Sequence, residues 1–217
     1  MDFFPLWLSL KVSVTATILT VATGLPLAWV LALKRFPGRD LAEALVVLPL
    51  VLPPTVLGYY LLVLISRQGA IGRVLDAAGI ELAFTWRAAV LAAWVGSSAL
   101  FIKAAQAGFE SVDRRLEQAA LTLGRSPWSV FWSVTLPLAS RAVMAGTVLA
   151  FCRALGDFGI TLMVAGSIPG LTQTTPLAIY DLVQSNRMAE ANTLSLIAVA
   201  TVALLLMGIG RLARLRF

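Results

Sequence analysis

The sequence predicts an all-α, polytopic membrane protein, built as a bundle of about five transmembrane helices. Of its 217 residues, 59% are hydrophobic and 13% are charged, and that charged share is about half of what soluble domains carry. The apolar residues also gather in runs that approach the roughly 20 residues needed to cross a hydrocarbon core. Each run is expected to be helical, because backbone polar groups in lipid must be satisfied within their own segment.

Five apolar runs define the expected spans, which together form a single transmembrane domain. They cover residues 12–33, 45–65, 88–109, 139–165 and 193–212. The first run is too long for a cleaved signal peptide, and its charged flank lies on the wrong side, so we expect a retained helix. Residues 113–137, between the third and fourth spans, are instead charged in their first half and rich in aromatic and hydroxyl groups in the second.

Lys and Arg residues cluster in the segments that would share one side of the membrane. These segments follow the first span, precede the fourth and follow the fifth, and their positive residues are Lys34, Arg35, Arg39, Arg114, Arg115, Arg125, Arg211, Arg214 and Arg216. Because positive residues in short loops favour the cytoplasm, we expect the N-terminus outside and the C-terminus inside. Orientation and lipid headgroups thereby explain the net charge of +6 without a nucleic-acid partner.

The chain lacks the residues that several kinds of chemistry require. The chain has no histidine, which removes the usual zinc ligands and the usual general base. Its one cysteine, Cys152, cannot form an intramolecular disulfide. No phosphate-binding loop and no Gly-x-Ser-x-Gly elbow occurs. The sequence therefore predicts a chain that is not an enzyme and holds no cofactor or metal. If transport is driven by ATP, another subunit must bind the ATP.

Helix-breaking residues interrupt the second span. Pro49, Pro53 and Pro54 remove three amide donors within six residues, so this helix must bend or break, and Gly58 adds conformational freedom. Broken helices in membranes pack against protein or line cavities. Two interpretations stay open: a kink filled by neighbouring helices, and a hinge that lines a pathway. Polar side chains beside the kink are Thr55, Tyr59 and Tyr60.

Charged residues also occur inside the third and fourth spans. Arg153 and Asp157 are spaced i, i+4, which predicts an ion pair that lowers the cost of placing either charge in the membrane. The pair either braces the bundle or lines and gates a pathway. Lys103 lies near the cytoplasmic end of its span, where its long side chain can reach the membrane surface.

Two loops are expected on the outer side. Residues 67–87 contain apolar residues at helical spacing, which predicts a short helix on the membrane surface. In the loop 168–190, Thr175 is the expected N-cap of a second short helix, with Pro176 at its first helical position. These elements act either as outer gates and receptor contacts or as caps of the bundle.

Residues 113–137 have the features of a contact site for a soluble partner. Leu116, Ala119, Ala120 and Leu123 fall at i, i+3, i+4 and i+7, which predicts a short helix with one apolar face. Gly124 can end this helix. Charged and polar residues cover the rest of it, namely Arg114, Arg115, Glu117 and Gln118. Pro127 prevents its continuation, and the aromatic residues expected at the inner membrane interface are Trp128, Phe131 and Trp132.

The spacing in this segment resembles the EAA loop of binding-protein-dependent ABC importer permeases. The family pattern is Glu-Ala-Ala, three residues, Gly, nine residues and Ile-x-Leu-Pro. Here the matching positions are held by Gln118, Ala119, Ala120, Gly124 and the run from Val134 to Pro137. Gln118 replaces the family glutamate, and Glu117 stands one place earlier, so either residue is a candidate for the contact that the family makes to its ATPase.

The resemblance extends over nearly the whole chain to the molybdate permease subgroup. Residues 48–60, 69–91 and 153–159 resemble that subgroup's second span, outer loop with third span, and fourth span, with Asp157 in place of an expected glutamate. It implies a homodimer in the cytoplasmic (inner) membrane, bound to two ABC ATPases that hold ATP and magnesium. An extracytoplasmic molybdate-binding protein would deliver molybdate or tungstate to a pathway between the two copies.

The resemblance also implies which residues act. The coupling residues are Arg115, Leu116, Glu117, Gln118, Ala119, Ala120, Leu123, Gly124 and Pro137. The kink of the second span and the charged pair of the fourth supply the candidate pathway or gate residues, which are Pro53, Pro54, Thr55, Tyr59, Arg153 and Asp157. ATP binding would move the helix 115–124 as a lever between inward-open and outward-open states. The alternatives are a permease for another oxyanion such as sulfate, a freestanding channel or secondary transporter, and a membrane scaffold.

Overall fold

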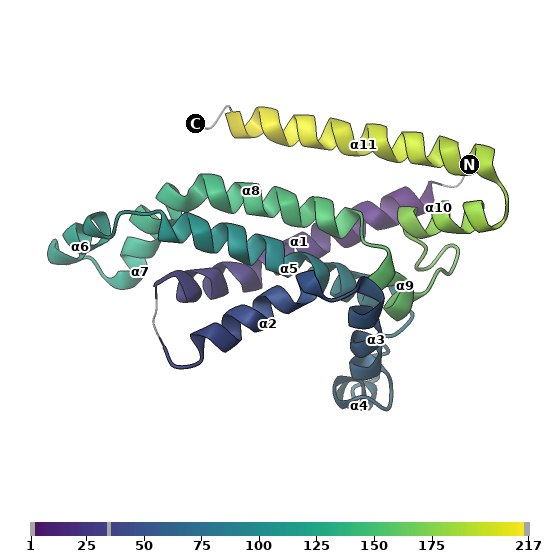
Figure 1. The fold of residues 1–217 in the computed structure, drawn as a ribbon, viewed down its shortest axis with the longest axis horizontal. Coiled ribbons are helices and arrows are strands. Elements are labelled where there is room, and N and C mark those ends of the chain that lie inside the picture. The colour runs from purple at the N-terminus through teal and green to yellow at the C-terminus, as the bar shows by residue number, and fades with distance from the viewer. Residues whose placement is uncertain (1–2, 34–35, 215–217) are drawn as a thin grey trace.

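The computed structural model describes residues 3–33 and 36–214, and these residues form helices, turns and loops without a strand (Figure 1). Lys34, Arg35 and Arg216, which entered the charge argument, lie outside the described residues. Four helical stretches are long and apolar enough to cross a membrane, and a bent helix pair raises the number to five. The prediction of a helical bundle with about five spans is confirmed.

Three long helices run side by side at the centre of the bundle: α1 (Phe4–Leu33), α5 (Trp86–Glu110) and α8 (Leu136–Leu155). Small residues allow their backbones to approach closely. A Cβ built at Gly24 of α1 would lie 2.7 Å from Phe101 Cδ1 of α5, and one built at Gly108 would lie 2.5 Å from Ala142 Cβ of α8. The core is therefore held by tight contacts between helices.

The second span is broken into α2 (Arg39–Val51) and α3 (Pro54–Ile65), whose axes differ by 113°. Leu52 and Pro53 between them have extended backbones. Pro54 begins α3, where its missing N–H leaves no helical hydrogen bond unmade. The prediction that the prolines bend or break this span is confirmed, and α3 turns away from the direction of α2 toward the short helix α4 (Ala70–Ala77) (Figure 1).

Gly58 has a different role from the flexibility expected of it. A Cβ at this position would lie 2.7 Å from Met163 Cβ and 3.1 Å from the backbone of Ile160. Both residues belong to α9 (Gly159–Ala165), whose first residue packs in turn against Pro54 at the start of α3. Gly58 lies inside a helix and provides a close contact between α3 and α9.

The fourth span, expected over residues 139–165, is not a single helix. The helical stretch starts earlier, with α7 (Pro127–Val130) and a π-helical turn, η1 (Phe131–Thr135), that leads into α8. It ends at Leu155, and Gly156, Asp157 and Phe158 separate it from α9. Pro137 lies in the first turn of α8, where proline is tolerated.

The short helices on the predicted outer side are present, with one correction. Residues 67–87 contain α4, as expected, but the N-cap of α10 (Thr175–Gln184) is Thr174. Thr175 is instead the first helical residue, and its groups bind α1: its backbone N–H donates to Ser9 Oγ at 2.8 Å, and its hydroxyl donates to the carbonyl oxygen of Pro5 at 3.1 Å. This residue ties α10 to the start of α1.

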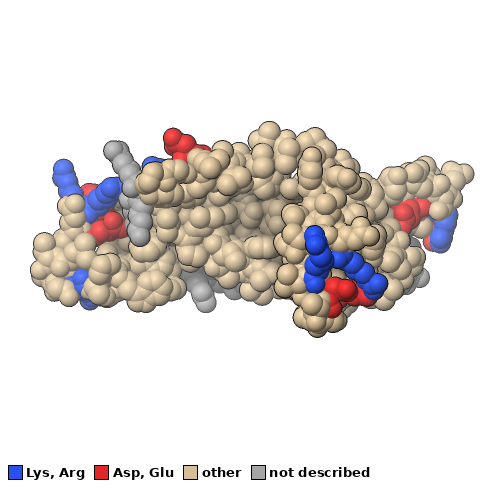
Figure 2. Space-filling view, turned by 90° about the horizontal axis from the view of Figure 1, so that it is seen from below, with Lys and Arg blue, Asp and Glu red and all other residues tan. Residues whose placement is uncertain are grey.

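The last helix, α11 (Met188–Arg214), contacts mainly α10 and lies apart from the central helices (Figure 1). A groove of about 850 Å³ lies between α11 and the helices α1 and α8, with α10 as a further wall, and mostly apolar side chains line it. Segments predicted to be cytoplasmic, including α7 and the end of α11, lie at one end of the bundle. On the face seen in Figure 2, charged residues gather toward the two ends and leave the middle uncharged.

Candidate functional site: a projecting helix and two broken spans

The predicted contact segment forms a short helix, α6 (Arg114–Thr122), at one end of the bundle (Figure 1). Its N-cap is Asp113, whose carboxylate accepts from the N–H of Arg115 at 2.9 Å. Gly124 ends the helix with φ at +83°, a conformation that glycine adopts without strain. Pro127 does not extend α6 and is instead the first residue of α7. Gly124 and Pro127 therefore both act as predicted.

No residue of α6 is buried. On the predicted apolar face, Leu116 is 49% exposed and Leu123, just past the helix end, is 84% exposed, while Ala120 is half-buried. The helix therefore presents an apolar face with small residues that its own chain leaves largely uncovered.

Glu117 and Gln118 point to different surroundings. Thr135 Oγ1 donates to Glu117 Oε1 at 2.5 Å, and Thr135 is buried in the π-helical turn before α8. Gln118 is exposed and forms no side-chain hydrogen bond within residues 3–33 and 36–214. The carboxylate of Glu117 thus holds α6 to the base of α8, and Arg125 adds a second link, a 3.2 Å bond from its guanidinium to Ser133 Oγ.

The aromatic residues after α6 divide between surface and core. Trp128 and Trp132 are exposed, as expected of interfacial anchors. Phe131 is instead buried, with its ring 4.9 Å from that of Trp29 and 6.0 Å from that of Phe109. It belongs to the core, where it packs against Trp29 of α1 and Phe109 of α5, so the prediction that it lies at the membrane interface is wrong.

The predicted ion pair of the fourth span is confirmed, although the helix ends between its two members. Arg153 Nη1 donates to Asp157 Oδ1 at 2.9 Å, and Asp157 is 3% exposed. Its other oxygen accepts from the backbone N–H of Thr161 at 3.0 Å and from the Thr161 hydroxyl at 2.6 Å. Because both oxygens are bonded within the chain, the pair braces the α8–α9 break, which favours the structural interpretation over direct contact with a substrate.

The two broken spans meet in space. Pro54 and Gly58 of α3 contact Gly159 and Ile160 of α9, immediately after the Arg153–Asp157 pair. The other candidate pathway residues, Pro53, Thr55 and Tyr59, are exposed on the surface of this single chain. The breaks therefore form one irregular region, with Pro53, Thr55 and Tyr59 on its outer surface.

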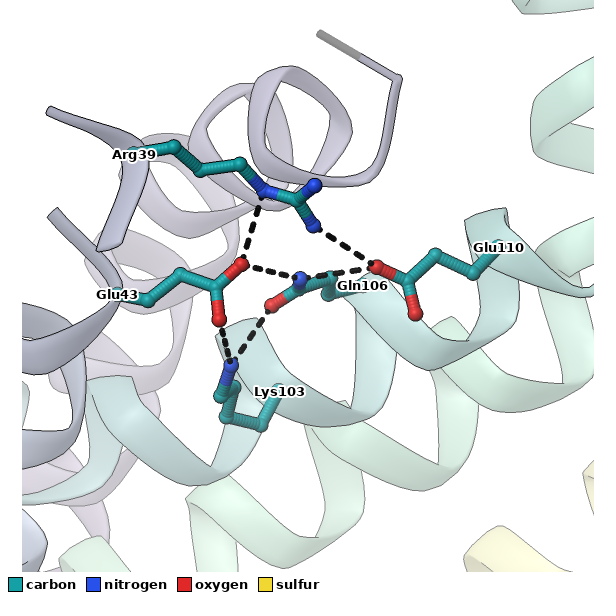
Figure 3. Close-up of polar contacts among 5 residues, drawn as sticks. All are labelled: Arg39, Glu43, Lys103, Gln106 and Glu110. Carbon is teal, nitrogen blue, oxygen red and sulfur yellow. Dashed lines mark hydrogen bonds and ion pairs between the residues drawn. The ribbon is translucent and has the colours of Figure 1, made fainter. Parts of the chain in front are cut away.

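A charged cluster that the sequence did not predict lies between α2 and α5 (Figure 3). We call it the α2–α5 network; its members are Arg39, Glu43, Lys103, Gln106 and Glu110. Glu43 Oε1 accepts from Arg39 Nε at 3.0 Å and from Gln106 Nε2 at 3.3 Å, and its Oε2 lies 3.3 Å from Lys103 Nζ. Glu110 pairs with Arg39 at 3.5 Å and accepts from Gln106 at 3.0 Å. Lys103 is thus partnered, rather than simply reaching for the membrane surface.

The arrangement defines a class of protein: a polytopic membrane protein that has broken spans inside and a short, uncovered helix at one end. The family model described as "Binding-protein-dependent transport system inner membrane component" matches residues 24–215. This chain belongs to that family of multi-pass inner-membrane transport components, which confirms the resemblance seen in the sequence.

Relatives and solved structures agree with this assignment. The chain is 50% identical over 179 residues to "Molybdenum transport system permease protein ModB" of Escherichia coli (strain K12), covering 82% of this chain and 78% of the relative. It is 33% identical to "Probable sulfate transport system permease protein cysT" of Chlorokybus atmophyticus, covering 93% and 70%. A bacterial ABC transporter involved in alginate import shares the fold, with a TM-score of 0.76 at 15% identity, covering 95% and 78%.

Proposed function

We propose that this chain is the permease subunit of an ATP-driven importer that passes molybdate or tungstate into the cytoplasm. Two copies form the pathway in the bilayer, two ABC ATPases bind α6 from the cytoplasm, and an extracytoplasmic binding protein delivers the anion. The observation that carries the proposal is α6, an apolar-faced helix that buries none of its residues within its own chain. The higher identity to a molybdenum permease than to a sulfate permease supports the choice of anion.

The contact with the ATPase uses the face of α6 that its own chain leaves open. Leu116, Ala119, Ala120 and Leu123 enter a groove of the ATPase, and the alanines let the two surfaces approach closely. Gln118 makes a neutral hydrogen bond to the ATPase, since Glu117 is engaged by Thr135. ATP and magnesium bind to the ATPase, and this chain carries out no hydrolysis.

ATP binding moves the bundle through the base of α8. When the ATPases close, they displace α6, and the Glu117–Thr135 and Arg125–Ser133 bonds move the start of α8 with it. The displacement tilts α8 and α9 as a rigid unit, because the Arg153–Asp157 pair and Thr161 bridge the break between them. Pro53, Pro54, Thr55 and Tyr59 then change their distance from the same residues of the second copy, which opens or closes the pathway.

The test is co-purification of the chain with its bound subunits, followed by uptake into proteoliposomes that contain the chain, the ATPase and the binding protein. We expect ATP-dependent uptake of molybdate that tungstate inhibits and excess sulfate does not. Preferential inhibition by sulfate would make the chain a sulfate permease. Gradient-driven uptake by the chain alone would make it a channel or secondary transporter, and unchanged uptake in cells that lack the chain would make it a scaffold.

A further inference from the structure

The α2–α5 network lies between the two parts of the chain that transport must connect. Glu110 is the last residue of α5, three positions before Asp113, the N-cap of α6. At the other side, α2 leads directly to the break at Leu52 and Pro53 and then into α3. A displacement of the projecting helix therefore reaches the network before it reaches the broken span.

We propose that Glu43 is a positioning residue for transport: the network that it centres fixes α2 to α5, so that movement at α6 also moves the α2–α3 break. The inference rests on the proposed function and adds a second route to the one through α8. The two routes meet at the contact between α3 and α9. The contact between α3 and α9 is thus displaced by α2 from one side and by α8 from the other.

The network, rather than apolar packing, sets the position of α2. This helix has no buried residue, and its apolar contribution to the core comes from the partly buried Ala42 and Val46. Small, partly exposed apolar contacts permit a helix to slide or rotate along its neighbour. Directional bonds from Glu43 to Gln106 and Lys103 of α5, together with the pair between Arg39 and Glu110, fix both the rotation and the height of α2 on α5.

The charges of the network balance internally. Two cations, Arg39 and Lys103, face two carboxylates, Glu43 and Glu110, and the amide of Gln106 bonds to both carboxylates. Gln106 is buried, while Arg39 and Glu43 are each 29% exposed. Such a half-buried network is more than a set of isolated surface pairs, because each group limits the freedom of the next. Loss of Glu43 leaves three donors without their shared acceptor.

The variant Glu43→Gln tests the proposal, with Asp40→Asn as its matched control. Both changes replace a carboxylate of α2 by its amide, but Asp40 is exposed and outside the network. The readout is the amount of molybdate taken up per ATP hydrolysed, in proteoliposomes with the ATPase and the binding protein. Because a loss of protein alone lowers uptake and hydrolysis together, this ratio separates positioning from stability.

We expect Glu43→Gln to retain the bound ATPase and its hydrolysis but to lower the ratio by about fivefold or more, the lower end of typical coupling between sites. Asp40→Asn should keep the ratio of the unaltered protein. The double variant Glu43→Gln with Lys103→Gln should resemble Glu43→Gln alone, because both changes disconnect the same bond. An unchanged ratio in Glu43→Gln would overturn the inference while leaving the proposed function intact.

A second variant keeps the test decisive if Glu43→Gln does not accumulate in the membrane. Gln106→Met removes the amide that bonds to both carboxylates and keeps a side chain of similar length. It should lower the same ratio, and a ratio equal to that of the unaltered protein would contradict the proposal. If the unaltered complex shows no ATP-dependent uptake, the proposed function fails, and the inference fails with it.

Discussion

The ion pair at the break between α8 and α9 allows a prediction of defined size. The change Arg153→Met removes the guanidinium and keeps much of the apolar stem. Asp157 then remains buried, at 3% exposure, without the one cation that pairs with it in the described part of the chain. Its bonds from the Thr161 N–H and hydroxyl persist. The variant thus isolates the cost of a buried carboxylate that keeps hydrogen bonds but loses its counter-charge.

The structure sets the size of the effect. Removing one member of a buried pair typically costs about 3–5 kcal/mol. Here the side chain of Arg153 is 29% exposed, so solvent already screens part of its attraction, and Thr161 continues to stabilise the charge. We therefore expect a loss of about 2–3 kcal/mol. For a chain of this length the loss lowers the apparent Tm by roughly 4–12 °C.

The assay is thermal unfolding of the purified protein in detergent, for Arg153→Met alone and combined with Asp157→Asn. Asn keeps an oxygen that accepts from Thr161 and removes the unpaired charge. We expect the double variant to be more stable than Arg153→Met alone. Losses that add independently, so that the double variant has the lower Tm, would refute the claim that these two charges stabilise one another.

Three further predictions concern α6 and α3. Ala120→Glu should release the ATPase during co-purification, because a charged head must leave water to enter the groove; full retention with normal transport would refute the docking assignment. Glu117→Ala should lower thermal stability by about 1.5–3 kcal/mol, because the buried Thr135 hydroxyl loses a hydrogen bond to a charged group. Gln118→Ala should weaken ATPase binding without that loss, and the reverse pattern would exchange their roles. Gly58→Ala should destabilise the protein by about 1–3 kcal/mol, because the added Cβ would collide with α9. The control Gly208→Ala lies at a helical position open to space and should not destabilise it. Equal Tm values for the two variants would contradict the close contact between α3 and α9.

Much of the fold follows from local chemistry that the sequence displays. Apolar run length locates the long helices, and the prolines at 53 and 54 mark the broken span because a proline ring removes a donor wherever it stands. Gly58 shows the limit of such reasoning. Flexibility and close approach both require glycine, and only the position of Met163 and Ile160 in a distant segment shows which one applies. The interruption at residues 156–158 was likewise hidden, because an apolar run can contain two helices.

In the candidate site too, features set by neighbouring residues could be predicted from the sequence, and contacts between distant segments could not. The spacing of the apolar face and the cap residues predicted α6, since each lies within a few positions of the next. The sequence indicates no partner for the Glu117 carboxylate within the chain, because Thr135 lies 18 positions away. Each half of the α2–α5 network is visible as a helical pair in the sequence. Their meeting is not visible, because it depends on how α2 packs along α5.

In the proposed mechanism, α6 connects ATP hydrolysis by the partner ATPase to anion movement through this chain. The decisive experiment compares ATP-dependent molybdate uptake by proteoliposomes that hold the unaltered chain or Ala120→Glu, each with the ATPase and the binding protein. We predict uptake by the unaltered chain, and loss of both uptake and bound ATPase in the variant. Equal uptake by the two proteins, or uptake that does not require ATP, would contradict the claim.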